Sequence, residues 1–338
     1  MKPSEIKTFL SAAIKNLLPV LITGAPGIGK SDIVAQAADD ASADLILSHP
    51  AVADPTDAKG LPWVVDGHAT FLPFGELQRA IDASKPTVWF LDDLGQASPA
   101  VQASFMQLLL ARRVNGHNLS EHVTFIAATN RRTDRAGVSG VLEPVKSRFG
   151  SIVELTADVD DWCRWAIDRD IAPELIAFLR FKPDLLCAFT ANADLTNSPV
   201  PRTWSHVARI MGLGLPAGIQ HAAFAGAVGE GAATEFTAFL RLYAELPSVD
   251  QVLIDPDSVK MPKQPSSLYA LAGAIAHRTN KGNFARVARF IDRMIAEGHG
   301  EFGVLTVRDA MQRDSTITQT QAFVRLATGE LGELIAGK

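Results

Sequence analysis

Short apolar runs alternate with amphipathic stretches over the first half of the chain. The apolar runs with the length and side chains of buried strands lie at residues 19–23, 45–47, 87–91, 123–128 and 152–155. The stretches with apolar positions at helical spacing lie at residues 4–16, 30–39, 74–83 and 99–111. Ser4 is predicted to cap the first helix. Strands that alternate with helices predict a parallel sheet with helices on both faces over residues 1–156.

Two tight hairpins are predicted inside this region. Asp66-Gly67 separates two apolar runs within residues 63–72, and Asn115-Gly116 divides residues 113–119. Asp-Gly and Asn-Gly between such runs are the strongest short-range hairpin signals, because both residues tolerate positive φ. Each hairpin is therefore expected as an insertion into the α/β pattern, although a simple decoration of the sheet is an alternative.

The pattern changes from Asp158 onward, where strand signals nearly vanish and helical periodicity takes over. The clearest helical stretches are residues 159–167, 173–179, 204–210 and 235–243. Residues 248–265 are rich in proline and are predicted to be an ordered connection, followed by two or three more helices. The second half of the chain is therefore expected to be all-α.

Composition places the chain among ordinary globular proteins, and its charge argues against some classes of partner. It has 338 residues, 20% of them charged, and a formal net charge of −5, so no overall basic field attracts nucleic acid, although a local patch stays possible. Cys163 and Cys187 lack a C-x-x-C spacing and are expected to be reduced thiols. Residues 210–228 are poor in charge but contain Pro216 and four glycines, so no membrane span is predicted. A cytoplasmic location is expected.

A glycine-rich turn carries the most specific chemistry in the sequence. Residues 24–31 read G-x-x-x-x-G-K-S, and they lie between a predicted strand and a predicted helix, as this phosphate-binding motif requires. Backbone N–H groups and the helix N-terminus would hold the phosphates, Lys30 would reach the β- and γ-phosphates, and the Ser31 hydroxyl would bind Mg²⁺. The predicted nucleotide-binding residues are Gly24, Ala25, Pro26, Gly27, Ile28, Gly29, Lys30, Ser31 and Asp32.

Polar residues end two of the other buried strands. The apolar run 88–91 delivers Asp92 and Asp93 to the carboxyl edge of the sheet, where open α/β sheets bind ligands. Asp92 is predicted to hold the metal, directly or through water, and Asp93 to polarise the attacking water. Asn130 ends the neighbouring strand and could orient that water, with a simple strand-terminating turn as the alternative.

Together these features resemble an AAA+ ATPase. The features are the phosphate turn, the acidic strand end, the A-T-N strand end, the S-R-F segment 147–149 and the following helices. The two hairpins, and Pro201-Arg202 at the start of a later helix, resemble the MoxR branch. The resemblance covers roughly residues 5–215. It implies a P-loop AAA+ αβα domain at 1–156 and a helical lid at 157–215. Helical periodicity beyond the resemblance predicts an additional C-terminal all-α domain at 216–338.

The resemblance also implies roles for individual residues. Lys30 and Ser31 match Walker A, Asp92 and Asp93 match Walker B, Asn130 matches sensor 1, Arg148 matches an arginine finger that acts on the neighbouring subunit, and Arg202 matches sensor 2. A solvated surface arginine is the alternative for Arg148. Arg131, Arg132 and Lys146 are reserve cations near these sites, and a solvated role is expected for each.

The chain departs from the family at two places. The family usually has Glu where this chain has Asp93, which is one methylene shorter, and small misplacements of a catalytic group are costly. Slow, partner-stimulated hydrolysis is therefore expected. The segment Leu142-Glu143-Pro144 stands where the family more often has Leu-Pro-Glu, so the short helix before Arg148 matches the family pattern less well.

The resemblance implies a Mg²⁺-dependent ATP hydrolase that forms a ring, most often a hexamer. Its partner would be a client or adaptor protein, such as one with a von Willebrand A domain, which the chain would remodel or activate. The inserted hairpins would face the central pore or the client. Two alternatives stay open at this point: a nucleic-acid-associated motor, against which the net charge argues, and an ATP-switched scaffold with little turnover.

Overall fold

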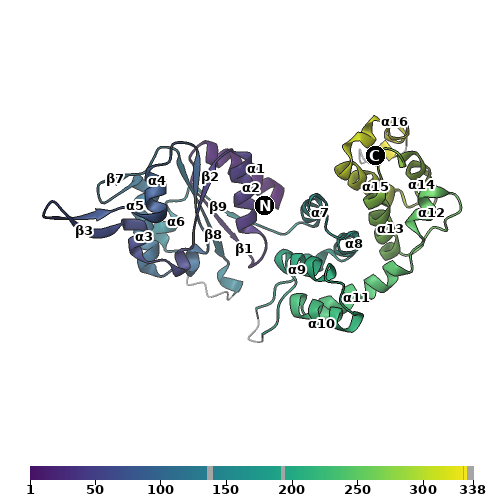
Figure 1. The fold of residues 1–338 in the computed structure, drawn as a ribbon, viewed down its shortest axis with the longest axis horizontal. Coiled ribbons are helices and arrows are strands. Elements are labelled where there is room, and N and C mark those ends of the chain that lie inside the picture. Colours follow the sequence, from purple (N-terminus) through teal and green to yellow (C-terminus); the bar gives the residue numbers. More distant parts are fainter. Residues whose placement is uncertain (135–139, 192–194, 330, 333–338) are drawn as a thin grey trace. The chain divides into compact units, whose positions relative to one another are not determined.

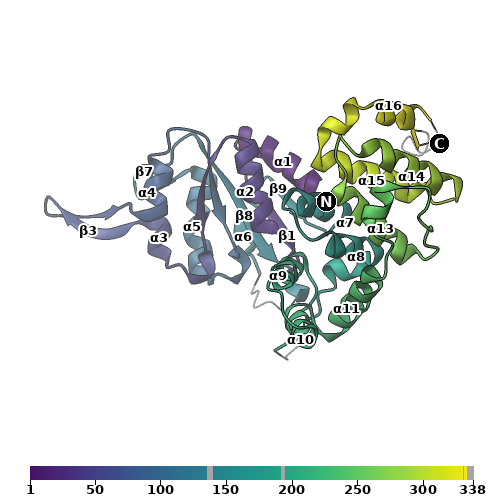
Figure 2. The same ribbon diagram turned by 45° about the vertical axis from the view of Figure 1, so that its right-hand side comes forward.

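A computed structural model describes the chain except residues 135–139, 192–194, 330 and 333–338. The chain divides into two compact units. The first consists of residues 1–158 with 189–194, and the second of residues 159–188 with 195–338. Each unit, drawn as a ribbon in Figures 1 and 2, has its own hydrophobic core.

A five-stranded parallel sheet forms the centre of the first unit, in the strand order β2-β5-β8-β1-β9. The strands are β1 (Val20–Gly24), β2 (Asp44–Ser48), β5 (Thr87–Leu91), β8 (Val123–Asn130) and β9 (Ser151–Glu154). All four pairings in this sheet are parallel. The carboxyl ends of β5, β8 and β1 therefore lie side by side at one edge of the sheet. The predicted α/β sheet is confirmed.

The helices of the first unit cover both faces of this sheet. They are α1 (Pro3–Lys15), α2 (Lys30–Asp40), α3 (Pro55–Lys59), α4 (Gly75–Ile81), α5 (Pro99–Ala111) and α6 (Glu143–Lys146). On the face of α3 to α6, Trp89 packs between Phe105 and Phe125, with ring centroids 5.9 and 5.3 Å away. On the other face the Thr124 hydroxyl donates to the Ile14 carbonyl of α1, at 3.2 Å. This alternation follows from the two-residue period of a strand.

The first helix begins one residue earlier than predicted, so the prediction of Ser4 as its cap was wrong. The N-cap is Lys2, and Pro3 occupies the first helical position. Proline is favoured there because its φ is already helical and its missing N–H would have had no helical partner. The Glu5 carboxylate accepts from the Lys2 N–H at 3.1 Å and satisfies one of the exposed donors of the helix start.

Both predicted hairpins are present. The first pairs β3 (Leu61–Val65) with β4 (His68–Leu72), and the second pairs β6 (Arg113–Val114) with β7 (His117–Asn118). Both turn residues have positive φ in each case, 52° and 78° in Asp66-Gly67 and 48° and 88° in Asn115-Gly116. This conformation matches the right-handed twist of the paired strands.

The described residues of the second unit form helices and no strands. The α-helices are α7 (Val159–Asp168), α8 (Pro173–Phe181), α9 (Pro201–Met211), α10 (Ala217–Val228), α11 (Glu230–Ala244), α12 (Val249–Ile254), α13 (Pro265–Arg278), α14 (Phe284–Ala296), α15 (Gly300–Arg313) and α16 (Gln321–Thr328). Throughout the part of the chain that the structure describes, every helix is too short or too polar to cross a membrane.

Two predictions for this unit were wrong. Residues 248–265 contain the helix α12, because Val252 is buried in the core and tertiary packing stabilises this short segment. Four helices, not two or three, follow Pro265 among the described residues.

The junction between α14 and α15 is only three residues long, and Gly298, at φ 83°, makes the sharp turn that separates them.

A buried ion pair and a buried thiol lie within the core of the second unit. The guanidinium of Arg180, on α8, forms a bidentate contact with the Asp309 carboxylate of α15, and its Nη2 donates to Oδ1 at 2.9 Å. Removing one partner of such a pair costs about 3–5 kcal/mol, because the other charge is left buried. Nearby, burial raises the pKa of the Cys163 thiol to about 12, which makes it unreactive at neutral pH.

Candidate nucleotide-binding site

The glycine-rich turn joins β1 to α2 and takes a conformation that requires its glycines. Gly27 and Gly29 have φ of 72° and 103°, in the left-handed region that side chains disfavour. A Cβ on Gly24 would lie 3.0 Å from the Leu155 carbonyl oxygen, so close packing also disfavours a side chain there. The turn thus brings backbone N–H groups to the N-terminus of α2, an arrangement suited to binding an anion.

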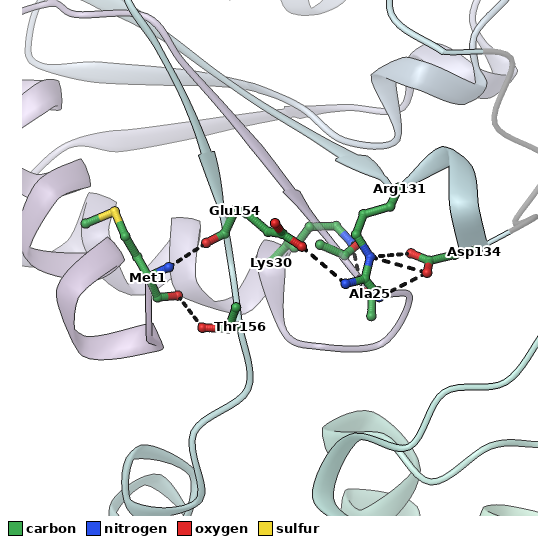
Figure 3. Close-up of polar contacts among 8 residues, drawn as sticks. Met1, Ala25, Lys30, Arg131, Asp134, Glu154 and Thr156 are labelled. Atoms are coloured by element: carbon green, nitrogen blue, oxygen red, sulfur yellow. Dashed lines mark hydrogen bonds and ion pairs between the residues drawn. The ribbon is translucent and has the colours of Figure 1, made fainter.

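Lys30 is buried at the start of α2, and three oxygens hold its ammonium group. Nζ donates to the carbonyls of Gly24 and Ala25, each at 3.0 Å, and to Oδ1 of Asn130 at 2.7 Å. Figure 3 shows Lys30 against Ala25 of the turn. The ammonium is therefore fixed between the turn and the end of β8, where it can stabilise the charge of a bound phosphate.

Ser31 and Asp92 form the part of the site that fits a metal. The Ser31 hydroxyl donates to Oδ2 of Asp92 at 2.7 Å, and Oδ1 of Asp92 accepts from the Asp93 N–H at 3.0 Å. The described residues contain no group of three or more His, Cys, Asp or Glu side chains that could hold a metal ion without further ligands. Two adjacent hard oxygens suit Mg²⁺, which is usually bound by one or two protein oxygens together with phosphates and waters.

Asn130 links Lys30 to Asp93. Its Oδ1 accepts from the Lys30 ammonium, so its amide nitrogen faces the other way and donates to Oδ1 of Asp93 at 3.4 Å. Asp93 itself has φ 55°, a left-handed conformation that Asp tolerates better than most residues. The register of the sheet explains this contact, because Gly24 pairs with Asn130 while β5 ends opposite Ala127. The last residues of β8 therefore extend to the loop that carries Asp93.

Arg131 is an ion-pair residue, so the expectation of a solvated role was wrong for it. Its guanidinium binds the buried Asp134 in a bidentate manner and donates to Glu154 on β9 (Figure 3). The hydrogen bond to Asp134, more than that to Glu154, raises the pKa of Arg131 despite partial burial. Sequence reasoning missed both carboxylates, although the Arg-x-x-Asp spacing was visible.

The other two reserve cations differ from each other. Lys146 forms a surface ion pair with Glu143 on the same short helix, and both side chains are accessible to solvent, in agreement with the expected solvated role. Arg132 is exposed to solvent, as expected.

The remaining predicted site residues lie outside the contact network around Lys30. Arg148 is half-buried, and its Nε donates to the Met106 carbonyl of α5 at 2.9 Å while Nη1 contacts the Pro144 carbonyl. The helix α6 before it forms despite the unusual Leu142-Glu143-Pro144 order, with Pro144 in its first turn. Asp32 is exposed in the first turn of α2, and Arg202 is exposed in the first turn of α9, in the second unit.

A comparison with protein families identifies this fold. Residues 19–149 match the model of the AAA domain, dynein-related subfamily. This region of the chain carries an AAA domain. The match includes β1, the glycine-rich turn, both hairpins and the strand ends at Asp92 and Asn130. The predicted fold class, an AAA+ αβα domain followed by a helical region, is confirmed.

The solved structures that match this chain resemble it only distantly. The RuvB Holliday junction branch migration motor of Thermotoga maritima is 17% identical, with 81% of this chain and 80% of that chain covered and a TM-score of 0.39. NtrX from Brucella abortus in complex with ADP is 12% identical, with 99% and 67% covered and a TM-score of 0.43. Likenesses this weak carry no argument about activity or partners. No curated protein matches the chain.

The AAA+ domain thus presents three kinds of polar group at one edge of its sheet. The turn supplies N–H donors and the Lys30 ammonium, Ser31 and Asp92 supply adjacent hard oxygens, and the pair of Asp93 and Asn130 supplies a carboxylate held by an amide. Chemically, this set can bind an anion, coordinate a cation and accept a proton from water.

Proposed function

We propose that the chain is a Mg²⁺-dependent ATPase of the MoxR branch of AAA+ proteins. In this proposal it assembles into a ring, most simply a hexamer, and uses ATP binding and hydrolysis to remodel or activate a partner protein. Residues 1–156 would bind the nucleotide, 157–215 would act as the lid, and 216–338 would form the additional helical domain. The observation that carries the proposal is the chain of contacts from Lys30 through Asn130 to Asp93, beside the Ser31–Asp92 pair.

Each of these side chains at the carboxyl edge of the sheet has a separate task in the proposed reaction. The turn and Lys30 would bind the phosphates, and Ser31 and Asp92 would hold Mg²⁺, which neutralises charge on the phosphates when bound. Asp93 would accept a proton from the attacking water. Asn130, which already contacts both Lys30 and Asp93, would keep the water-activating carboxylate in register with the phosphate-binding ammonium.

The proposed ring assigns a task to Arg148 on a neighbouring subunit. Within its own chain the guanidinium donates to two neutral carbonyls, those of Met106 and Pro144, and these weak acceptors can be exchanged for a phosphate oxygen. The Arg148→Ala variant is expected to bind ATP normally and to lose hydrolysis by about 10³-fold or more, because transition-state charge is left unstabilised. Phosphate release and binding of a fluorescent ATP analogue measure the two effects.

Mixed rings test whether Arg148 acts between subunits. Rings assembled from Arg148→Ala and Lys30→Ala subunits contain some sites with an intact turn and an intact neighbouring arginine, so about a quarter of wild-type activity should return in an equal mixture. Lys146→Ala, on the adjacent short helix, is the matched control and should retain activity. Mixed rings without any activity would remove the role of Arg148 between subunits.

The β3–β4 hairpin supports the proposed contact with a partner protein. It extends away from the sheet (Figures 1 and 2), and Trp63 and Val64 are 65% and 66% exposed. Leu61, Phe71 and Leu72 are also exposed large apolar residues on this two-stranded ribbon. Apolar side chains gathered in this way indicate a surface that another protein covers.

The double variant Trp63→Ser/Val64→Ser is expected to uncouple the ATPase from its partner. Basal hydrolysis should stay within about twofold of wild type, because surface substitutions change stability little. Stimulation by the partner should be lost. The matched control is Val52→Ser, since Val52 is 88% exposed but lies outside the hairpin. Equal stimulation of the double variant and wild type would contradict a role for the hairpin.

A further inference from the structure

We propose that Arg131 is a positioning residue of the nucleotide site and that it holds Asn130 through a set of ion pairs, the Arg131 strap. The strap consists of Arg131, Asp134 and Glu154. This inference rests on the proposed function, because the geometry that it maintains is that of the reaction between nucleotide and water. Asn130, immediately before Arg131, is the side chain whose position the strap would control.

The strap spans three adjacent strands. Nε and Nη2 of Arg131 donate to the two oxygens of Asp134, each at 3.0 Å, and Nη1 donates to Oε1 of Glu154 at 3.2 Å. Arg131 follows the end of β8, and Glu154 ends β9, with β1 between these two strands. The guanidinium therefore bridges across the end of β1 at the level where the glycine-rich turn begins (Figure 3).

The two carboxylates contribute unequally to the strap. The Asp134 side chain is only 6% exposed, and it makes a two-bond contact in a geometry that arginine matches well. The Glu154 side chain is 50% exposed and makes one bond, so solvent weakens this contact. In addition, the Asp134 N–H donates to the Arg131 carbonyl at 3.1 Å and closes a tight turn. Asp134 therefore fixes the backbone that follows Asn130, and Glu154 adds a weaker lateral support.

Asn130 needs this support because its two contacts point to different parts of the site. It meets the Lys30 ammonium at 2.7 Å, a strong charge-assisted bond, and Asp93 at 3.4 Å, which is near the limit of a hydrogen bond. A small shift of the β8 end would break the second contact before the first. Loss of the strap should therefore disturb the water-activating side of the site more than the phosphate-binding side, which β1 and α2 build.

The experiment compares Arg131→Gln with Arg131→Lys, Asp134→Asn and Glu154→Gln. Arg131→Gln and Asp134→Asn are expected to lower kcat for ATP by about tenfold to a hundredfold. KM and ADP affinity should change by less than about threefold, because the turn and Lys30 stay in place. Arg131→Lys should restore part of kcat, and Glu154→Gln should lower it by less than about threefold. Arg132→Gln, next in the chain and exposed, is the matched control.

A spectroscopic readout does not depend on turnover. The side-chain amide resonances of Asn130, assigned by their loss in Asn130→Asp, should shift in Arg131→Gln and stay in place in Arg132→Gln. If wild type hydrolysed no ATP while these shifts appeared, the proposed function would fail and the positioning role would stand.

Three results would overturn the positioning role. One is an unmoved Asn130 resonance in Arg131→Gln. Another is a raised KM with unchanged kcat, which would mean that Arg131 contacts the nucleotide directly. The third is equal loss in Arg131→Gln and Arg131→Lys together with a lower unfolding temperature, which would mean that the strap is only structural.

Discussion

The Lys30→Ala variant is expected to lose ATP hydrolysis and to bind nucleotide about 10- to 100-fold more weakly, because a hydrogen bond to a charged group contributes roughly 1.5–3 kcal/mol. The ammonium is already fixed by the Gly24 and Ala25 carbonyls and by Asn130, so it meets a phosphate with little reorganisation. The loss in hydrolysis should exceed the loss in affinity, since charge on the phosphates grows in the transition state. Calorimetry with ADP and a phosphate-release assay measure the two quantities.

A control variant distinguishes an effect of Lys30→Ala on the site from an effect on the fold. Lys15→Ala, at the exposed end of α1, removes a lysine of the same unit without touching the turn and should behave as wild type. Circular dichroism should show the same helix content in both variants. Nucleotide binding that is unchanged in Lys30→Ala would contradict the glycine-rich turn as the phosphate site.

The Asp93→Asn variant is expected to lower hydrolysis by about 10²- to 10⁴-fold, the usual contribution of a general base, and to retain ATP binding. Asn is the closest neutral replacement in shape, and it also tolerates the left-handed backbone conformation found at this position. Single-turnover hydrolysis and binding of a fluorescent ATP analogue separate chemistry from affinity. Hydrolysis at the wild-type rate would remove Asp93 from the mechanism.

The same position tests whether a short carboxylate slows the enzyme. Asp93→Glu extends the side chain by one methylene and is expected to raise basal hydrolysis by about tenfold if reach limits the wild-type rate, although the left-handed backbone disfavours Glu by about 1 kcal/mol. A wild-type rate near zero with ATP-dependent assembly intact would instead favour the switched scaffold. Stimulation of hydrolysis by DNA would favour a nucleic-acid motor.

The Asp93→Asn variant also offers a way to find the partner. An ATPase that binds but does not hydrolyse ATP should retain a partner that turnover normally releases. A protein retained only in ATP, and then shown to stimulate purified wild-type chain, would meet the expectation for a client or adaptor. A protein that is retained with or without nucleotide would not meet this expectation.

Local patterns were sufficient to predict most elements of the AAA+ domain. The predicted strands 87–91 and 123–128 are largely apolar runs, and such runs stay buried in a parallel sheet irrespective of their neighbours. The Asp66-Gly67 and Asn115-Gly116 turns depend on two residues each, so the hairpins were visible as well. The helix α12 was missed because its formation depends on the burial of Val252 in a core assembled from distant helices.

In the candidate site, too, some features followed from the sequence and others were decided by the tertiary structure. The order of residues in the chain specified the glycine-rich turn, its Lys30 and Ser31, and the acidic strand end at Asp92 and Asp93, because each group is adjacent in sequence to the element that positions it. The contacts between these groups were decided by strand order and register alone. These place Asn130 opposite Gly24 and bring Arg131 within reach of Glu154, which lies 23 residues further along the chain. Only parallel pairing around β1 can join these residues, since a periodic pattern carries no information about which strands become neighbours.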